Sequence, residues 1–200
     1  MKKLSTKIPD LFLLEPIVFA DDRGFFLESY NQRTFADLGI RQTFVQDNHS
    51  FSGQNVIRGL HYQIQQPQGK LVRAISGEIL DVAVDLRRSS PTFGQWESFL
   101  LSGENKRMVW IPAGFAHGFR VTAPNTHVLY KATDFYAPEH ERTILWNDPD
   151  LRIDWQIKNW QIDAGADAPA KHAPSPIVSE PVVSDKDRRG VSFQQAETFA

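Results

Sequence analysis

The sequence has no cysteine, no long apolar run and little net charge. The absence of cysteine excludes disulfide bonds and thiolate chemistry. No apolar run approaches the ~18 residues of a membrane-spanning helix, so a membrane is not an expected partner. A net charge of −2 at pH 7 gives no overall attraction to nucleic acid. Pro9, Asp10, Glu15 and Pro16 interrupt the stretch that would form the apolar part of a signal peptide, so we expect a soluble, cytoplasmic protein.

Apolar residues are plentiful, at 41% of 200 residues with 14 Phe and 5 Trp, which suits one domain with a sizeable core. Alternating patterns predict short strands over residues 71–75, 79–86, 96–101, 107–111, 119–121 and 127–133, separated by turn-forming Gly, Pro, Ser and Asn. A short helix is predicted over residues 31–38, with Gly39 just beyond it. Many short strands with few helices predict an antiparallel sandwich or barrel.

The composition changes after Trp155, where residues 156–182 become rich in Ala, Asp and Pro. We interpret them as a loop excursion between a domain over residues 1–155 and a C-terminal segment, 183–200, that packs back on that domain. Ser184 followed by Asp187 has the spacing of a capping box and predicts a helical turn.

The stretch from Val56 to Gln63 is predicted to be a strand that carries a titratable histidine. Strict alternation gives it two faces: Val56, Leu60 and Tyr62 on one, and Ile57, Gly59 and His61 on the other. Arg58 and His61 would then point in opposite directions. A bulge at Gly59 would turn both to the same side, and we expect one if Arg58 and His61 share a site.

A second histidine motif is Pro112-x-Gly114-x-x-His117, which places an imidazole close to a tight turn. In metal-binding cupins this motif supplies one ligand, and an earlier His-x-His supplies two more. Here the corresponding residues are His61-Tyr62-Gln63, so one imidazole is missing. Tyrosine and amide side chains are poor substitutes in an iron or zinc site, and we therefore predict no metal.

Other polar residues give no functional signal when each is taken alone, because Lys70 has the position of an ordinary strand-end lysine and Tyr130 that of a core residue. Their significance comes from eight stretches taken together: residues 19–30, 44–50, 58–63, 69–73, 90–96, 110–119, 129–133 and 136–142. In this order they closely resemble the dTDP-4-dehydrorhamnose 3,5-epimerase family, over roughly residues 8–155 plus a short tail. The resemblance implies an all-β, antiparallel jelly roll, a cupin-like double-stranded β-helix with short peripheral helices.

The resemblance also implies a role for each matching residue. His61 would be the base, Tyr130 the acid on the opposite face, Lys70 the cation at the enolate oxygen, and Asp187 or Asp185 the partner of the base. Tyr136 would stack on thymine. The implied substrate-binding residues are Arg23, Glu28, Gln46, Asp47, Asn48, Arg58, Lys70, His117, Tyr136, Glu141 and Lys186. The family uses no cofactor and forms homodimers that exchange N-terminal strands.

The implied reaction is the epimerisation of dTDP-4-dehydro-6-deoxy-D-glucose at C3 and C5. Both carbons flank the C4 ketone, so loss of either proton gives an enolate that a nearby cation stabilises. Three alternatives stay open: epimerisation at one carbon only, a metal-dependent cupin enzyme, and a sugar-nucleotide binder without activity.

Overall fold

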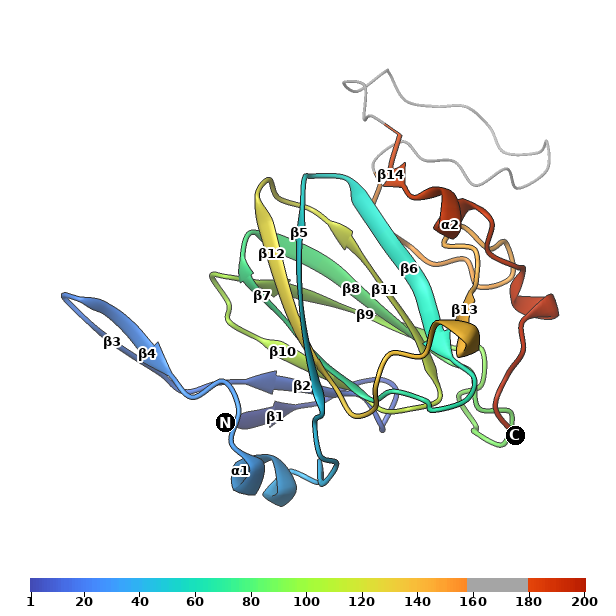
Figure 1. The fold of residues 1–200 in the computed structure, drawn as a ribbon. Helices are drawn as coiled ribbons and strands as arrows, with labels where there is room; N and C mark the ends of the chain where they lie inside the picture. Colours follow the sequence, from blue (N-terminus) through green and yellow to red (C-terminus); the bar gives the residue numbers. More distant parts are fainter. Residues whose placement is uncertain (158–179) are drawn as a thin grey trace.

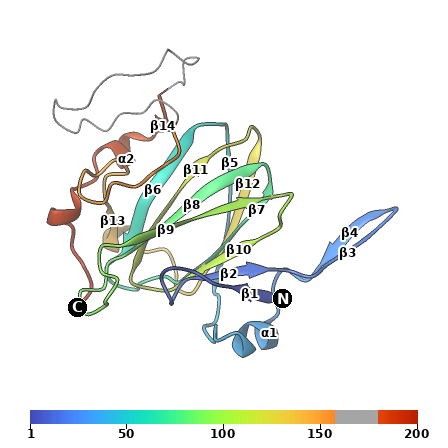
Figure 2. The same ribbon diagram turned by 180° about the vertical axis from the view of Figure 1, so that it is seen from behind.

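Two β-sheets packed face to face form the body of the molecule (Figures 1 and 2). The computed structural model describes residues 1–157 and 180–200. One sheet has the order β1 (Lys2–Leu4), β2 (Phe12–Glu15), β10 (Met108–Ile111), β7 (Lys70–Ser76), β12 (Thr126–Ala132), β5 (Gln46–Ser52). The other has β13 (Glu141–Thr143), β6 (Val56–Gln63), β11 (Phe115–Val121), β8 (Glu78–Asp85), β9 (Trp96–Ser102), with β14 (Val182–Val183) beside β6. Among the described residues, the strands of both sheets pair antiparallel except for β14 with β6, and two isolated bridges, Arg87 with Phe199 and Ile144 with Val191, are also parallel. This arrangement confirms the predicted all-β fold.

The remaining elements are peripheral. β3 (Val18–Asp21) and β4 (Gly24–Leu27) form a hairpin that extends away from the sheets (Figure 1). The predicted helix is confirmed as α1 (Gln32–Asp37), capped by the Asn31 side chain, and the predicted turn as α2 (Asp185–Arg188), capped by Ser184. Two 3₁₀ turns cover Pro138–His140 and Phe193–Gln195. In the described part of the chain, no helix is long and apolar enough to span a membrane.

Apolar side chains form a core between the sheets and a further cluster on the outer side of each sheet. The inner core contains Val72 and Val128 from one sheet and Ile79 and Phe119 from the other. The outer side of the second sheet is covered by residues 144–155 and the C-terminal segment, and α1 covers part of the first. Because the second sheet is covered on both sides, β8 is buried along almost its whole length.

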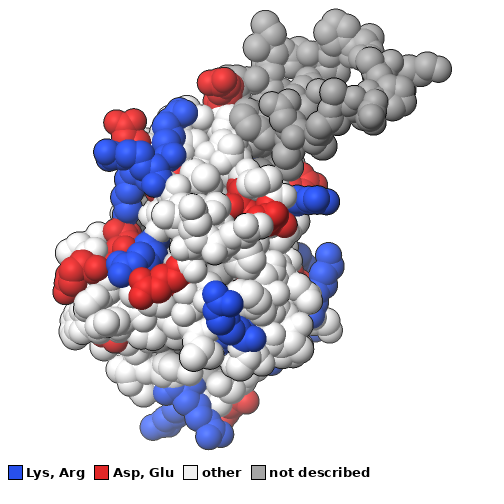
Figure 3. Space-filling model, turned by 90° about the vertical axis from the view of Figure 1, so that its right-hand side faces the viewer, with Lys and Arg blue, Asp and Glu red and all other residues white. Residues whose placement is uncertain are grey.

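The C-terminal segment returns to the body of the molecule after the undescribed residues. Val183 pairs with Ile57 across β14 and β6, and Ala196 is buried in the outer cluster of the second sheet. Most of the excursion predicted for residues 156–182 lies outside the described residues. On the face shown in Figure 3, acidic and basic side chains are interspersed rather than gathered by sign.

The predicted bulge in β6 is present and determines which side chains point inward. His61 lies opposite His117, whereas Arg58 lies opposite Phe119, so three steps along β6 match two along β11. The extra residue brings Arg58 and His61 to the same inner face. The predicted position of Ile57 beside His61 is wrong: because of the bulge, Ile57 faces outward and packs in the outer cluster with Leu60.

Gly59 is the residue that allows this bulge. Its φ is +127°, and a Cβ built on it would lie 2.5 Å from the Gly118 Cα, which is backbone and cannot move aside easily. We therefore expect Gly59→Ala to lower the free energy of unfolding by about 2 kcal/mol or more. Urea unfolding measures this, with Gly53→Ala as the control, since an added Cβ there meets nothing within 4 Å. Equal stability of both variants would contradict this interpretation of the bulge.

Candidate active site

The inner faces of the two sheets carry the polar residues that the sequence singled out. His61 and His117 project inward from neighbouring strands of one sheet. Tyr130 on β12 packs against the inner core from the other sheet. Lys70 on β7 shares a face with Val72 and Ala74 of that core, because side chains alternate along a strand. The fold therefore brings together residues that are up to 69 positions apart in the sequence, from His61 to Tyr130.

His61 forms a close pair with Asp187 of α2. The His61 Nε2 lies 2.5 Å from the Asp187 Oδ1, and the Asp187 side chain is only 4% exposed. Burial by itself raises the pKa of Asp187, but the hydrogen bond and charge of His61, together with hydrogen bonds from Ser184 and Gly59, outweigh it and hold that pKa below its ordinary value. A carboxylate only accepts hydrogen bonds, so Nε2 carries the hydrogen, and Nδ1, which has no hydrogen-bond partner among the described residues, is the nitrogen that can accept a proton. Asp185, the other candidate partner, is exposed.

Lys70 and Tyr130 both have pKa values changed by burial. Burial lowers the pKa of Lys70 to about 8, against the opposing effects of the charges of Asp81 and Glu141. Within the described residues, the Lys70 ammonium forms no hydrogen bond or ion pair, so it remains available to a ligand. Burial raises the pKa of Tyr130, and the nearby Arg58 only partly offsets this. Near neutral pH, Lys70 is therefore mainly an ammonium and Tyr130 a neutral phenol that is able to donate a proton.

His117 has a carboxylate partner that the sequence analysis did not identify. The His117 Nε2 lies 2.8 Å from the Asp81 Oδ2, and both residues are buried. Asp81 was missed because an acidic residue in an alternating strand is usually solvent-facing. The sequence feature that could have indicated its burial is its position between the apolar pairs Ile79-Leu80 and Val82-Ala83. Across residues 1–157 and 180–200, no group of three His, Asp or Glu side chains is placed to hold a metal ion.

A connected set of polar side chains surrounds these central residues. The Asn48 Oδ1 accepts from the Gln46 amide, and the Gln46 Oε1 accepts from the Tyr136 backbone. The Tyr136 hydroxyl donates to Glu141, which also forms a 2.5 Å ion pair with Lys186. Burial raises the pKa of Glu141, but Lys186 and Tyr136 outweigh that effect and lower it.

Arg58 approaches the same region from β6. Its guanidinium donates to the Ser52 hydroxyl on β5 at 3.0 and 3.1 Å, which fixes its position between the two sheets. Its Nη2 also donates to the Phe51 carbonyl oxygen at 3.4 Å, which leaves Nη1, on an exposed residue, as the guanidinium nitrogen without a hydrogen bond among the described residues. An arginine held in this way suits a phosphate group, which it contacts with paired donors.

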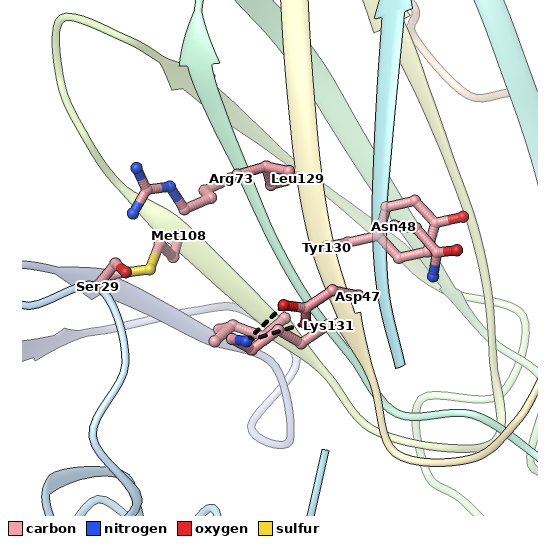
Figure 4. Close-up of a pocket in the computed structure, with 9 residues that line it drawn as sticks. Ser29, Asp47, Asn48, Arg73, Met108, Leu129, Tyr130 and Lys131 are labelled. Carbon is pink, nitrogen blue, oxygen red and sulfur yellow. Dashed lines mark hydrogen bonds and ion pairs between the residues drawn. The ribbon is translucent and has the colours of Figure 1, made fainter. Parts of the chain in front are cut away.

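Three of the expected binding residues lie away from this cluster. Asp47 projects to the outer side of its sheet and forms a 2.9 Å ion pair with Lys131. Figure 4 shows this pair beside Arg73, around a cavity of about 200 Å³, while Tyr130 and Asn48 point to the other side. Arg23 pairs with Asp21 at the tip of the β3–β4 hairpin, and Glu28 accepts from Asn31 beside α1.

Comparison with known proteins places this fold and site in one family. A family model described as dTDP-4-dehydrorhamnose 3,5-epimerase matches residues 5–195. The enzyme of that name from Pseudomonas aeruginosa is 56% identical over 200 residues, covering 100% of this chain and 99% of that protein. A 3,5-epimerase from Legionella pneumophila, solved with dTDP-4-keto-L-rhamnose, is 44% identical with a TM-score of 0.85, covering 98% and 94% of the two chains. ChmJ, a 3′-monoepimerase from Streptomyces bikiniensis solved with dTDP-quinovose, is 28% identical with a TM-score of 0.79, covering 94% and 86%. The chain belongs to the dTDP-4-dehydrorhamnose 3,5-epimerase family.

Proposed function

We propose that this chain epimerises dTDP-4-dehydro-6-deoxy-D-glucose at C3 and C5 to give dTDP-4-dehydro-L-rhamnose. The observation that carries the proposal is the His61–Asp187 pair, which lies on the inner face of one sheet and faces the sheet whose inner side carries Lys70 and Tyr130. This combination supplies a base, a cation and an acid, which are the three groups that epimerisation beside a ketone requires. The 3,5-epimerases at 44–56% identity support two-carbon chemistry more strongly than the monoepimerase at 28%.

Each epimerisation needs one proton removed and one returned to the opposite face of the same carbon. The Nδ1 of His61 takes the proton from carbon, and the electron pair of the broken C–H bond moves onto the C4 oxygen. Asp187 stabilises the imidazolium that forms. Lys70 balances the negative charge of the enolate oxygen. Tyr130 then delivers a proton to the opposite face of the carbon. Proton exchange with solvent restores the imidazole and the phenol.

The surrounding polar residues have the chemistry to hold the nucleotide part of the substrate. Arg58 and Lys186 are cations near the site that suit the diphosphate. Tyr136 is about half exposed as a residue, at 52%, and its ring offers a stacking surface for thymine. Gln46, Asn48 and Glu141 orient these groups through the hydrogen bonds described above.

The substrate assignment is tested by incubating the purified chain with dTDP-4-dehydro-6-deoxy-D-glucose in the presence of EDTA. We expect dTDP-4-dehydro-L-rhamnose as the product, identified by NMR. A product changed at C3 or C5 alone would favour a single-position epimerase. Activity that EDTA removes and iron, manganese or zinc restores would favour a metal-dependent cupin enzyme.

We also propose that the working form is a homodimer in which the β3–β4 hairpin reaches the partner's site. The hairpin extends away from its own sheets (Figure 1) and exposes Phe19, Phe25 and Phe26 by 61–70%. Aromatic side chains exposed to this extent are typical of a surface that another chain covers. Arg23 and Glu28, which do not reach the cluster in their own chain, would then contribute to the second copy.

Mixing two inactive variants tests this exchange. Arg23→Ala removes a hairpin contribution and His61→Asn removes the base, so we expect each homodimer to be nearly inactive. After subunit exchange, half of the dimers are mixed, and each mixed dimer has one intact site. The mixture should regain roughly a quarter of wild-type activity. No recovery, although mass spectrometry detects mixed dimers, would contradict the exchange.

A further inference from the structure

Asp81 is a buried carboxylate whose hydrogen-bonding capacity is only half used. It lies in the middle of β8 and is 0% exposed. Its Oδ2 accepts from the His117 Nε2 at 2.8 Å, whereas its Oδ1 is buried and has no hydrogen-bond partner among the described residues. A buried carboxylate oxygen without a partner is costly, and such groups in folded proteins usually have a functional reason.

Lys70 is a buried cation on the inner face of the opposite sheet, and the charge of Asp81 acts on it. β7 and β8 lie in opposite sheets. Val72 shares a strand face with Lys70, Ala83 shares one with Asp81, and Val72 and Ala83 meet in the inner core. Asp81 is the strongest of the charges that oppose the effect of burial on the Lys70 ammonium, ahead of Glu141, whereas Lys186 acts in the other direction. Without Asp81, one fewer negative charge would oppose the lowering of the Lys70 pKa by burial.

The need for such a counter-charge follows from the chemistry of the site. A neutral amine at position 70 would leave the enolate oxygen without a positive charge, so the reaction requires the ammonium form. A carboxylate in direct contact with Lys70 would compete with the substrate oxygen for that ammonium. Asp81 avoids this competition because its only hydrogen bond is to His117, and among the described residues it forms no ion pair with Lys70.

We propose that Asp81 is a positioning residue that keeps Lys70 charged for the enolate and fixes His117 through its second oxygen. The role of Asp81 in catalysis rests on the proposed function, whereas the effect of its charge on Lys70 concerns the protein alone. Because the carboxylate accepts from Nε2, His117 carries its hydrogen there and, when neutral, presents Nδ1 to the ligand as an acceptor.

The proposal predicts a change in the titration of Lys70 when the charge of Asp81 is removed. Asp81→Asn keeps an acceptor for His117, so a purely structural role would be largely preserved. We expect the titration midpoint of Lys70 to fall by about one pH unit. The active ammonium form exists below this pKa and is lost as pH rises through it. The kcat/KM of the variant should therefore be about five-fold lower at pH 8 and little changed at pH 6.

The direct measurement is a ¹³C NMR titration of the Lys70 side chain, assigned by comparison with Lys70→Met. Asp148→Asn is the matched control, since Asp148 is also buried but bonds to the backbone of Leu151 and Phe193. Asp81→Ser, which leaves room for water, replaces Asp81→Asn if the latter does not fold. An unchanged Lys70 midpoint in a folded variant would overturn the proposal. The titration needs no substrate, so a failure of the epimerase assay would overturn the proposed function and not this inference.

Discussion

His61→Asn is expected to lower kcat by about 10³-fold or more while leaving the fold intact. Asparagine retains the approximate size and polarity of histidine and can still bond to Asp187, but it cannot take a proton from carbon near neutral pH. The Nε2 of His61 is already committed to Asp187 at 2.5 Å, so removal of the ring removes the one free basic nitrogen, Nδ1.

The control for this change is His127→Asn. His127 lies on the outer side of the first sheet, where it contacts His49 and Phe51. The His127→Asn variant should retain near-normal turnover. Circular dichroism and urea unfolding should show that both variants are folded. If His61→Asn kept more than about a tenth of wild-type activity, which exceeds what the loss of a general base allows, the base would have to be another residue.

Lys70→Met is expected to lower kcat by about 10²–10³-fold, with a smaller effect on KM. Methionine preserves the length and packing of the aliphatic chain but removes the charge that balances the enolate oxygen. Because that charge develops in the transition state, its loss should affect kcat rather than the binding of the neutral ketone.

A pH profile separates this role from simple packing. In the wild type, kcat/KM should fall as pH rises through about 8, the lowered pKa of Lys70. Lys70→Met should lose this alkaline limb, whereas Lys7→Met, at an exposed position, should retain it together with full activity. Activity of Lys70→Met within three-fold of wild type would show that another group stabilises the enolate.

The sequence was most informative where local patterns decide the structure. The strand Val56–Gln63 and the helix α1 are predicted because strand alternation and a glycine just after a helical stretch are local signals. The bulge at Gly59 was predicted from the need for Arg58 and His61 to share a face, and it is confirmed. β11 begins at Phe115, earlier than the predicted residue 119, because Gly114 adopts a φ of +95° and completes the turn immediately before it.

The sequence was least informative where burial depends on distant segments. β8 is covered on both sides, so its alternation does not distinguish an inward Asp81 from a solvent-facing residue. Asp185 and Asp187 are two positions apart in one short helix, and only the docking of that helix on β6 places Asp187 against His61. Asp47 matched the family by position, yet strand alternation puts it on the face opposite Gln46 and Asn48.

The central claim is that this site exchanges protons at both carbons beside the C4 ketone. It is tested most directly by incubating the wild-type chain with dTDP-4-dehydro-6-deoxy-D-glucose in deuterated water and locating the label by NMR. We predict deuterium at both C3 and C5, with His61→Asn giving label at neither carbon in the same time. Label at only one carbon would indicate a single-position epimerase, and no exchange at either carbon in the wild type would contradict the central claim.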